Sequence, residues 1–130
     1  MKVLLDTCAI LWAVSDPDSL TPRTRDVLTR ADTEVCISPI SCAEVACAVE
    51  RKRLELDRHW RLWFRHYLEL NGWKTVDIDL QIVEEAYSLP DPFHRDPADR
   101  IIVATARRLQ CPIVTADQKI LEYPHVETIW

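Results

Sequence analysis

The chain has 130 residues, 48% of them hydrophobic and 28% charged, and a formal net charge of −5. This balance excludes intrinsic disorder and predicts one soluble, folded domain over residues 1–130. A net charge of −5 does not suggest a nucleic-acid binder, although a local basic surface can override the sum.

Along the chain, short apolar runs alternate with segments of helical periodicity. The first half predicts strands at 2–6 and 34–38 and helices at 7–14, 21–31, 41–52 and 57–72. The second half predicts strands at 74–78, 112–116 and 126–130 and helices at 79–89, 97–110 and 117–123. Alternating strands and helices favour right-handed crossovers. We therefore expect a three-layer α/β/α domain with a central, mostly parallel sheet.

Two of the predicted helices carry clear local signals. Thr21 and Pro22 are typical of a helix cap and a first helical residue. The helix over 57–72 ends at Gly72, and aromatic residues recur along it at i, i+3, i+4 and i+7. These aromatic residues are Trp60, Trp63, Phe64 and Tyr67. The tryptophans fit the core or a dimer interface better than they fit stacking on bases.

Glycine and cysteine usage excludes several kinds of site. The single glycine, Gly72, rules out glycine-rich phosphate loops. The five cysteines are odd in number and show no C-x-x-C spacing, which disfavours a disulfide framework or a zinc cluster and favours a reducing, cytoplasmic environment. The first apolar segment contains Asp6 and lacks a small-residue cleavage site, so we expect neither a signal peptide nor a membrane span there.

Acidic residues fall where an open α/β sheet usually binds its ligands, beyond the carboxyl ends of the strands. Asp6 ends the first predicted strand, and Asp117 follows the strand over 112–116. Glu44 and Asp99 lie in the first turns of two predicted helices. These four acids could share one rim of the sheet.

The same acids also have explanations that involve no chemistry. Asp6 and Asp117 are good helix N-caps, and Ser41 with Glu44 fits a capping box of the S-x-x-E type. In the stretch HRDPADR, Asp96 can cap the helix that starts at the proline. Asp99 then occupies the third helical position, where the helix dipole favours a negative charge.

If these acids do meet, their mutual repulsion requires a cation among them. Oxygen ligands without cysteine or histidine suit Mg²⁺ or Mn²⁺ better than Zn²⁺. A site of this kind supports hydrolysis of a phosphodiester by metal-activated water.

Four segments together resemble the PIN-domain ribonucleases, in particular the VapC-type toxins of bacterial toxin–antitoxin pairs. They are VLLDTCAILW, ISPISCAEVACAVERKRLEL, HRDPADRIIVATA and CPIVTADQKI. They occur in the family's order over nearly the whole chain, and the third is the most specific. The segment VERKRLEL departs from many relatives, which carry a glycine in this basic turn.

The resemblance implies an endoribonuclease that depends on Mg²⁺, with Mn²⁺ as a substitute. It also implies a homodimer that a cognate antitoxin protein holds inactive. The family's acidic quartet corresponds to Asp6, Glu44, Asp99 and Asp117. Asp96 matches a frequently acidic neighbour, and Thr115 matches a position where a hydroxyl often supports the site. Arg100 is expected to pair with a nearby carboxylate or to orient one.

Basic residues that could bind RNA phosphates are concentrated in one region. They are Arg51, Lys52, Arg53, Arg58, Arg61 and Arg65. Three of them, Arg58, Arg61 and Arg65, follow i, i+3, i+7 spacing on a helix face distinct from the tryptophans. This pattern indicates either a phosphate-binding surface or the ordinary solvated face of an amphipathic helix.

Other functions remain as alternatives. A phosphatase of the haloacid dehalogenase type needs a second acid two residues after Asp6, where this chain has Cys8, which we expect to be small and buried. A receiver domain could use Lys119 but would leave Glu44 and Asp99 unexplained. A catalytically silent PIN-like module that binds RNA or protein is a further alternative, although the chain retains all four acids of the quartet.

Overall fold

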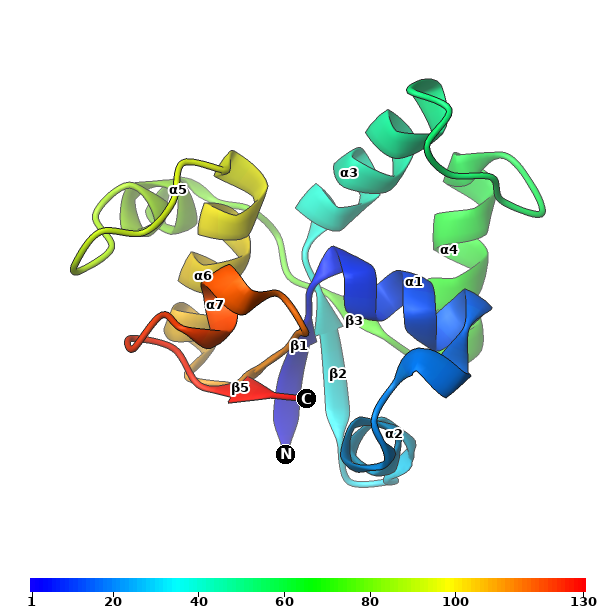
Figure 1. Cartoon of the computed structure of the whole chain (residues 1–130), viewed down its shortest axis with the longest axis horizontal. Coiled ribbons are helices and arrows are strands. Elements are labelled where there is room, and N and C mark those ends of the chain that lie inside the picture. Colours follow the sequence, from blue (N-terminus) through cyan, green and yellow to red (C-terminus); the bar gives the residue numbers. More distant parts are fainter.

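The central sheet of the computed structural model, which describes residues 1–130, lies between two layers of helices (Figure 1). Its strands are β1 (Lys2–Leu5), β2 (Glu34–Ile37), β3 (Lys74–Thr75), β4 (Ile113–Val114) and β5 (Thr128–Ile129). All four strand pairings are parallel, and the strand order is β3-β2-β1-β4-β5. The predicted α/β/α fold with a parallel sheet is therefore confirmed.

The helices are α1 (Thr7–Ser15), α2 (Pro22–Thr29), α3 (Pro39–Glu50), α4 (Trp60–Asn71), α5 (Leu80–Ala86), α6 (Pro97–Leu109) and α7 (Gln118–Leu121). A short 3-10 helix, η1 (Pro17–Ser19), follows α1 and was not predicted. None of the helices is both long enough and apolar enough to cross a membrane. Every predicted helix and strand exists, and the differences concern their lengths.

The last three strands are shorter than predicted. Each of β3, β4 and β5 has only two residues in the ladder, although the sequence predicted five-residue strands. The backbone of Val76 still donates to Ile37 at 2.9 Å, so the chain continues beside β2 beyond the end of β3. An apolar run predicts extended chain but does not show how much of that chain pairs with a neighbour.

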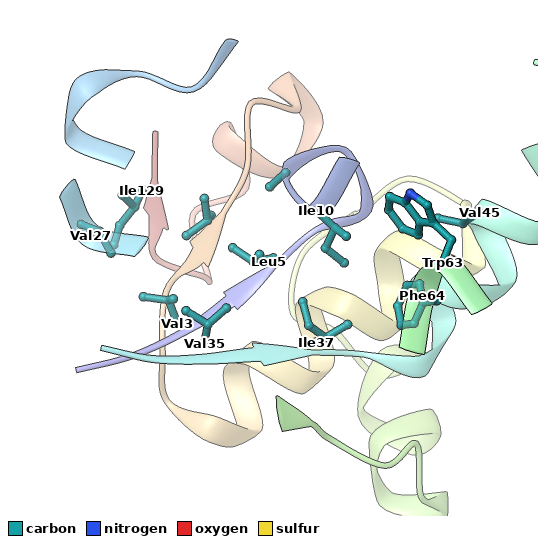
Figure 2. Close-up of a cluster of buried hydrophobic side chains, with 12 residues drawn as sticks. Val3, Leu5, Ile10, Val27, Val35, Ile37, Val45, Trp63, Phe64 and Ile129 are labelled. Carbon is teal, nitrogen blue, oxygen red and sulfur yellow. The ribbon is translucent and has the colours of Figure 1, made fainter. Parts of the chain in front are cut away.

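Side chains of the central strands alternate between two cores. In β1, Val3 and Leu5 enter a core that α1, α2, α3 and α4 cover (Figure 2). Leu4 points to the opposite face and packs with Ile102 of α6 and Ile120 of α7. Because both faces are covered, β1 reads as a continuous apolar run rather than as an alternating one.

Helix α4 confirms the expected aromatic stripe. Trp63 and Phe64 are buried in the core, and Trp60 and Tyr67 pack against it. Gly72 ends the helix in the left-handed conformation with φ of 65°, which glycine adopts without a steric penalty. The tryptophans therefore serve packing and do not form a stacking platform.

Helix α3 begins earlier than predicted, and this overturns the capping-box interpretation. Ser38 is the N-cap, its hydroxyl accepts from the backbone of Ile40 at 3.2 Å, and Pro39 is the first helical residue. The cap and proline pair at 38–39 is the stronger start signal. Glu44 consequently lies in the second turn of α3, where it caps nothing.

The strand order determines where a site can form. Strand β1 pairs with β2 on one side and with β4 on the other. The chain leaves β1 through α1 toward β2, and it returns to the other side of β1 through α6 and β4. In open α/β sheets, ligands bind at such a switch in direction, beyond the carboxyl ends of the strands. Asp6 and Thr115 follow the two strands that meet there.

Candidate functional site

Asp6 follows β1 directly and is 5% exposed. One carboxylate oxygen accepts from the backbone of Ala9 at 2.8 Å, which caps α1 and confirms the predicted cap. The other oxygen accepts a hydrogen bond from the Thr115 hydroxyl. The cap fixes the orientation of the carboxylate, so it supports the proposed role of Asp6 in a site.

Thr115 joins two of the predicted acids. Its fully buried hydroxyl donates to Asp6 and accepts from the backbone of Asp117 at 2.9 Å. The Asp117 carboxylate in turn accepts from the backbone of Lys119 at 2.9 Å and caps α7, as predicted. Thr115 thus contacts two of the four predicted acids, at the position where the family resemblance implies a supporting hydroxyl.

Glu44 reaches the site from α3 and is held by a side chain instead of a backbone group. The Thr7 hydroxyl, at the start of α1, lies 2.5 Å from Glu44 Oε1. The same hydroxyl lies 2.9 Å from Ser41 Oγ. Glu44 therefore meets the residue that directly follows Asp6.

Asp96 and Asp99 lie at the start of α6. Asp96 is the N-cap and accepts from the backbone of Asp99 at 3.1 Å, which confirms the predicted cap. Asp99 Oδ2 lies 2.9 Å from His94 Nε2, and both side chains are mostly shielded from solvent. Nε2 has no well-aligned acceptor, so this is a close contact and not a linear hydrogen bond.

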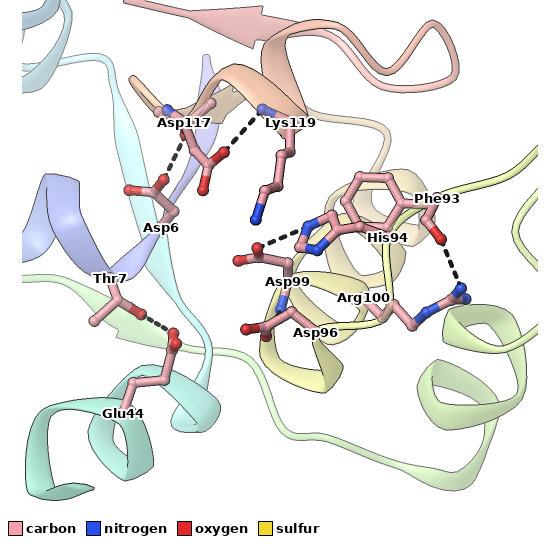
Figure 3. A network of polar contacts seen from close by, with 11 residues as sticks. Asp6, Thr7, Glu44, Phe93, His94, Asp96, Asp99, Arg100, Asp117 and Lys119 are labelled. Carbon is pink, nitrogen blue, oxygen red and sulfur yellow. Dashed lines mark hydrogen bonds and ion pairs between the residues drawn. The ribbon is translucent and has the colours of Figure 1, made fainter. Parts of the chain in front are cut away.

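All of the predicted acids lie around one space (Figure 3). Asp6 and Asp117 come from the ends of β1 and β4, Glu44 from α3, and Asp96 and Asp99 from the start of α6. The Lys119 ammonium points into the same space but lies within ion-pair distance of none of the carboxylates. The structure therefore brings together residues from four separate parts of the chain.

The pKa values of these acids show that their negative charges are poorly compensated. Burial raises the pKa of Asp6 to about 6, against the lowering effect of the Thr115 and Ala9 hydrogen bonds. Burial and then the charge of Asp96 raise the pKa of Asp99 to about 7. Burial also raises the pKa of Glu44, although its hydrogen bond with Thr7 opposes the shift. A cation in the shared space would stabilise the ionised forms.

The donor set fits a hard divalent cation. The acidic residues offer carboxylate oxygens, which Mg²⁺ and Mn²⁺ prefer. No three of these side chains already enclose a common point at metal-ligand distance. Such an enclosure is not needed for Mg²⁺, which keeps several waters and takes only one or two carboxylates directly. The remaining acids would hold those waters.

Arg100 does not pair with a carboxylate, and the prediction that it would is wrong. Its guanidinium donates to the backbone carbonyls of Ala86 at 3.0 Å and Phe93 at 2.9 Å. It also lies 5.3 Å from the centre of the Tyr87 ring. Arg100 therefore fastens α6 to α5 and to the segment that carries His94, and it points away from the acids (Figure 3).

Cys8 also differs from its prediction. Its side chain is exposed, because α1 turns this position toward the acids instead of the core. Burial of part of the thiol and the nearby charges of Asp6, Glu44, Asp117 and Asp99 raise its pKa to about 11. The thiol is therefore protonated near neutral pH and is a poor nucleophile.

The basic residues lie on the α3–α4 side of the molecule, and all of them are exposed. Arg58 precedes α4 and pairs with Asp57 at 3.1 Å, so the predicted helical spacing holds only for Arg61 and Arg65. Those two lie close enough to α3 to oppose the effect of burial, which raises the pKa of Cys42. The remaining three, Arg51, Lys52 and Arg53, lie in the turn after α3.

Sequence reasoning missed Thr7 and left His94 without a role. Thr7 directly follows a candidate acid, but its contact with Glu44 spans 37 positions and has no local signal. His94 lies five residues before Asp99, in a loop whose path the sequence does not define.

Comparisons with known proteins agree with this fold. The PIN domain family model matches residues 3–126. Ribonuclease VapC22 from Mycobacterium tuberculosis (strain ATCC 25618 / H37Rv) is 32% identical over 130 residues, which cover 98% of each chain. VapBC2 from Rickettsia felis, solved bound to a DNA fragment from its promoter, has a TM-score of 0.72 at 17% identity and covers 99% of this chain and 98% of that one. A toxin–antitoxin complex from Klebsiella pneumoniae has a TM-score of 0.64 at 22% identity, covering 98% and 96%. The two solved structures support the fold alone, and the family match and the relative show that the chain belongs to the PIN domain family.

Proposed function

We propose that the protein is a metal-dependent endoribonuclease and the toxin of a VapBC-type toxin–antitoxin pair. The observation that carries this proposal is the meeting of Asp6, Glu44, Asp99 and Asp117 in one partly buried space (Figure 3). The relative that is 32% identical over 98% of the chain is named a ribonuclease, which supports RNA as the substrate.

A bound Mg²⁺ or Mn²⁺ would act as a Lewis acid on the phosphodiester and make a water molecule easier to deprotonate. The protein's own contribution is to hold the acids in place. Thr115 orients Asp6 and Asp117, and the N-terminal turn of α6 fixes Asp99. With the Cys8 thiol protonated, we expect hydrolysis by water and no covalent intermediate.

The RNA backbone needs cations outside the acidic space. Exposed arginines on the α3–α4 side could bind phosphates, and Arg51, Arg53, Arg61 and Arg65 are the candidates without an ion-pair partner. Arg58 is a weaker candidate because Asp57 already pairs with it. We propose single-stranded or looped RNA as the substrate, because its backbone can bend into the acidic space.

We also propose a cytoplasmic antitoxin partner that covers the acidic space with a basic segment. Two structural neighbours, a VapBC pair and a toxin–antitoxin complex, support such a partner. The five cysteines are all free, in keeping with a reducing compartment. For the proposed homodimer, α5 and its C-cap residue Tyr87 offer exposed apolar side chains at Leu80, Val83 and Tyr87, which share one helical face.

The test is cleavage of single-stranded and structured RNA with Mn²⁺ or with EDTA, in parallel with two variants. Asp99→Asn should abolish cleavage. Asp91→Asn should leave it intact, because Asp91 pairs with His125 outside the acidic space. Equal cleavage by wild type and Asp99→Asn would overturn the proposal. Mn²⁺-dependent stabilisation without any cleavage would instead favour a silent module that binds RNA or protein.

A further inference from the structure

Glu44 differs from Asp6 and Asp117 in how its position is fixed. Asp6 and Asp117 are short side chains that accept from backbone groups, and Asp99 occupies the first turn of α6. Glu44 has one more rotatable bond, lies in the second turn of α3, and accepts from no backbone group. Its carboxylate therefore needs another restraint to hold one position in the site.

Thr7 provides the one hydrogen bond that Glu44 receives. Its hydroxyl lies 2.5 Å from Glu44 Oε1 and 2.9 Å from Ser41 Oγ. A hydroxyl carries a single proton, and an ionised carboxylate can only accept. The Thr7 proton must therefore go to Glu44, and Ser41 donates to Thr7. Ser41 is fully buried and has no other side-chain partner, so its hydroxyl is free to donate to Thr7.

We propose that Thr7 is a positioning residue that holds the Glu44 carboxylate for metal binding and turnover, with Ser41 holding Thr7. The inference rests on the proposed function and deepens it. Thr7 follows Asp6 directly, so the same turn that places one acid after β1 also restrains a second acid on α3. The positions of two acids from separate helices are thereby coupled.

The geometry gives Thr7 the same relation to Glu44 that Thr115 has to Asp6. In both cases a threonine after a strand donates to an acid from another element. Groups that hold metal ligands in this way typically change metal affinity or activity by about 10–100-fold when removed. The hydroxyl of Thr7 contacts only Glu44 and Ser41, so its effect should pass through Glu44.

The test compares Thr7→Val, which keeps the shape but removes the hydroxyl, with Thr7→Ser, which keeps the hydroxyl. Thr7→Val should weaken Mn²⁺ binding by about tenfold and lower kcat more than it raises KM for RNA. Thr7→Ser should remain within about threefold of wild type in both measurements. The Mn²⁺ affinity of Ser41→Ala should lie between those of the two Thr7 variants. In this variant Thr7 loses the hydrogen bond from Ser41 but can still donate to Glu44.

A double-mutant cycle separates positioning from packing. In a Glu44→Gln background, Thr7→Val should cause no further loss of Mn²⁺ affinity. Wild-type Mn²⁺ affinity in Thr7→Val, or equal losses in Thr7→Val and Thr7→Ser, would overturn the inference. If Thr7→Val does not fold, Ser41→Ala and Thr7→Ser decide, since the inference requires a loss only in the first.

The Mn²⁺ affinity of each variant is measured by titration calorimetry, which needs no RNA. A wild type that binds Mn²⁺ but cuts no RNA would therefore contradict the proposed function and still leave Thr7 to be judged by the affinity of its variants. The two ideas thus fail through different results.

Discussion

The Thr115 hydroxyl donates to the carboxylate of Asp6, a residue 109 positions earlier in the chain. Thr115 follows β4, Asp6 follows β1, and these strands are neighbours in the sheet. The hydrogen bond joins the carboxyl ends of β1 and β4, where the chain changes direction in the sheet and where the acids lie. It also lowers the pKa of Asp6, against the larger effect of burial.

Replacing Thr115 should damage both stability and the site. Thr115→Val leaves Oδ2 of Asp6 without its donor and the Asp117 backbone N–H without an acceptor in a buried place, whereas the Ala9 bond to the other Asp6 oxygen stays. We expect a loss of about 1–3 kcal/mol in the free energy of unfolding, measured with urea, and a clear loss of Mn²⁺ affinity.

Thr105→Val is the matched control for this substitution. Thr105 is equally buried, and its hydroxyl donates to the Ile101 carbonyl within α6. This variant should leave Mn²⁺ affinity unchanged. A similar loss of affinity in both variants would mean that the Thr115 bond has no special place in the site.

Removing the charge of Asp99 should stabilise the metal-free protein above neutral pH. The pKa of Asp99 is about 7 in the folded protein, against an ordinary value of 3.8, so the folded state holds this proton more tightly. The resulting stability is complete below pH 4 and is lost as the pH rises to 7, by up to about 4 kcal/mol.

In EDTA, the melting temperature of Asp99→Asn should therefore rise relative to wild type between pH 4 and pH 8. Mn²⁺ should reverse this order, because wild type binds the ion more tightly. If the difference in melting temperature between the two proteins does not change over this pH range, the raised pKa of Asp99 is contradicted.

Asp96 combines a cap and a charge, and two variants separate them. Asp96→Ala removes the acceptor for the Asp99 backbone and should cost about 1 kcal/mol of stability. Asp96→Asn keeps the cap but removes a charge that raises the pKa of Asp99. Carboxyl titration by NMR should show a lower Asp99 pKa in Asp96→Asn, and an unchanged pKa would rule out this electrostatic role.

Arg100 should matter for the packing of α6 rather than for metal binding. Arg100→Gln loses a charged donor to the Ala86 and Phe93 carbonyls, at an expected cost of about 1–3 kcal/mol. Amide hydrogen exchange should become faster over residues 87–96. Arg108→Gln is the control: Arg108 also lies on α6, but it pairs with Asp79 at 4.0 Å. This variant should leave the amides of residues 87–96 protected.

Much of the site could be predicted because it depends on backbone ends. Asp6, Asp96 and Asp117 are all helix caps, and a cap has a local signal in the sequence. Parallel crossovers then bring the carboxyl ends of the strands to one edge of the sheet, although they do not determine the strand order. The positions of these acids could be predicted because the residues that cap the helices are also the candidate metal ligands.

The errors concern contacts between elements that are distant in the chain. Glu44 fitted a capping box with Ser41, but the cap at Ser38 moved the start of α3 and left both residues facing Thr7. Arg100 was expected to pair with a nearby carboxylate or to orient one, whereas its guanidinium donates to two backbone carbonyls. Which partner such a side chain takes depends on tertiary packing, and a local sequence pattern does not predict that packing.

The most direct test of a shared metal site is Mn²⁺-induced line broadening in NMR spectra of backbone amides, at substoichiometric Mn²⁺. The expected result is broadening that is strongest around Asp6, Glu44, Asp99 and Asp117 together, and loss of this pattern in Asp99→Asn. Broadening confined to surface acids elsewhere, or to one of the four alone, would contradict the claim that these residues hold one metal centre.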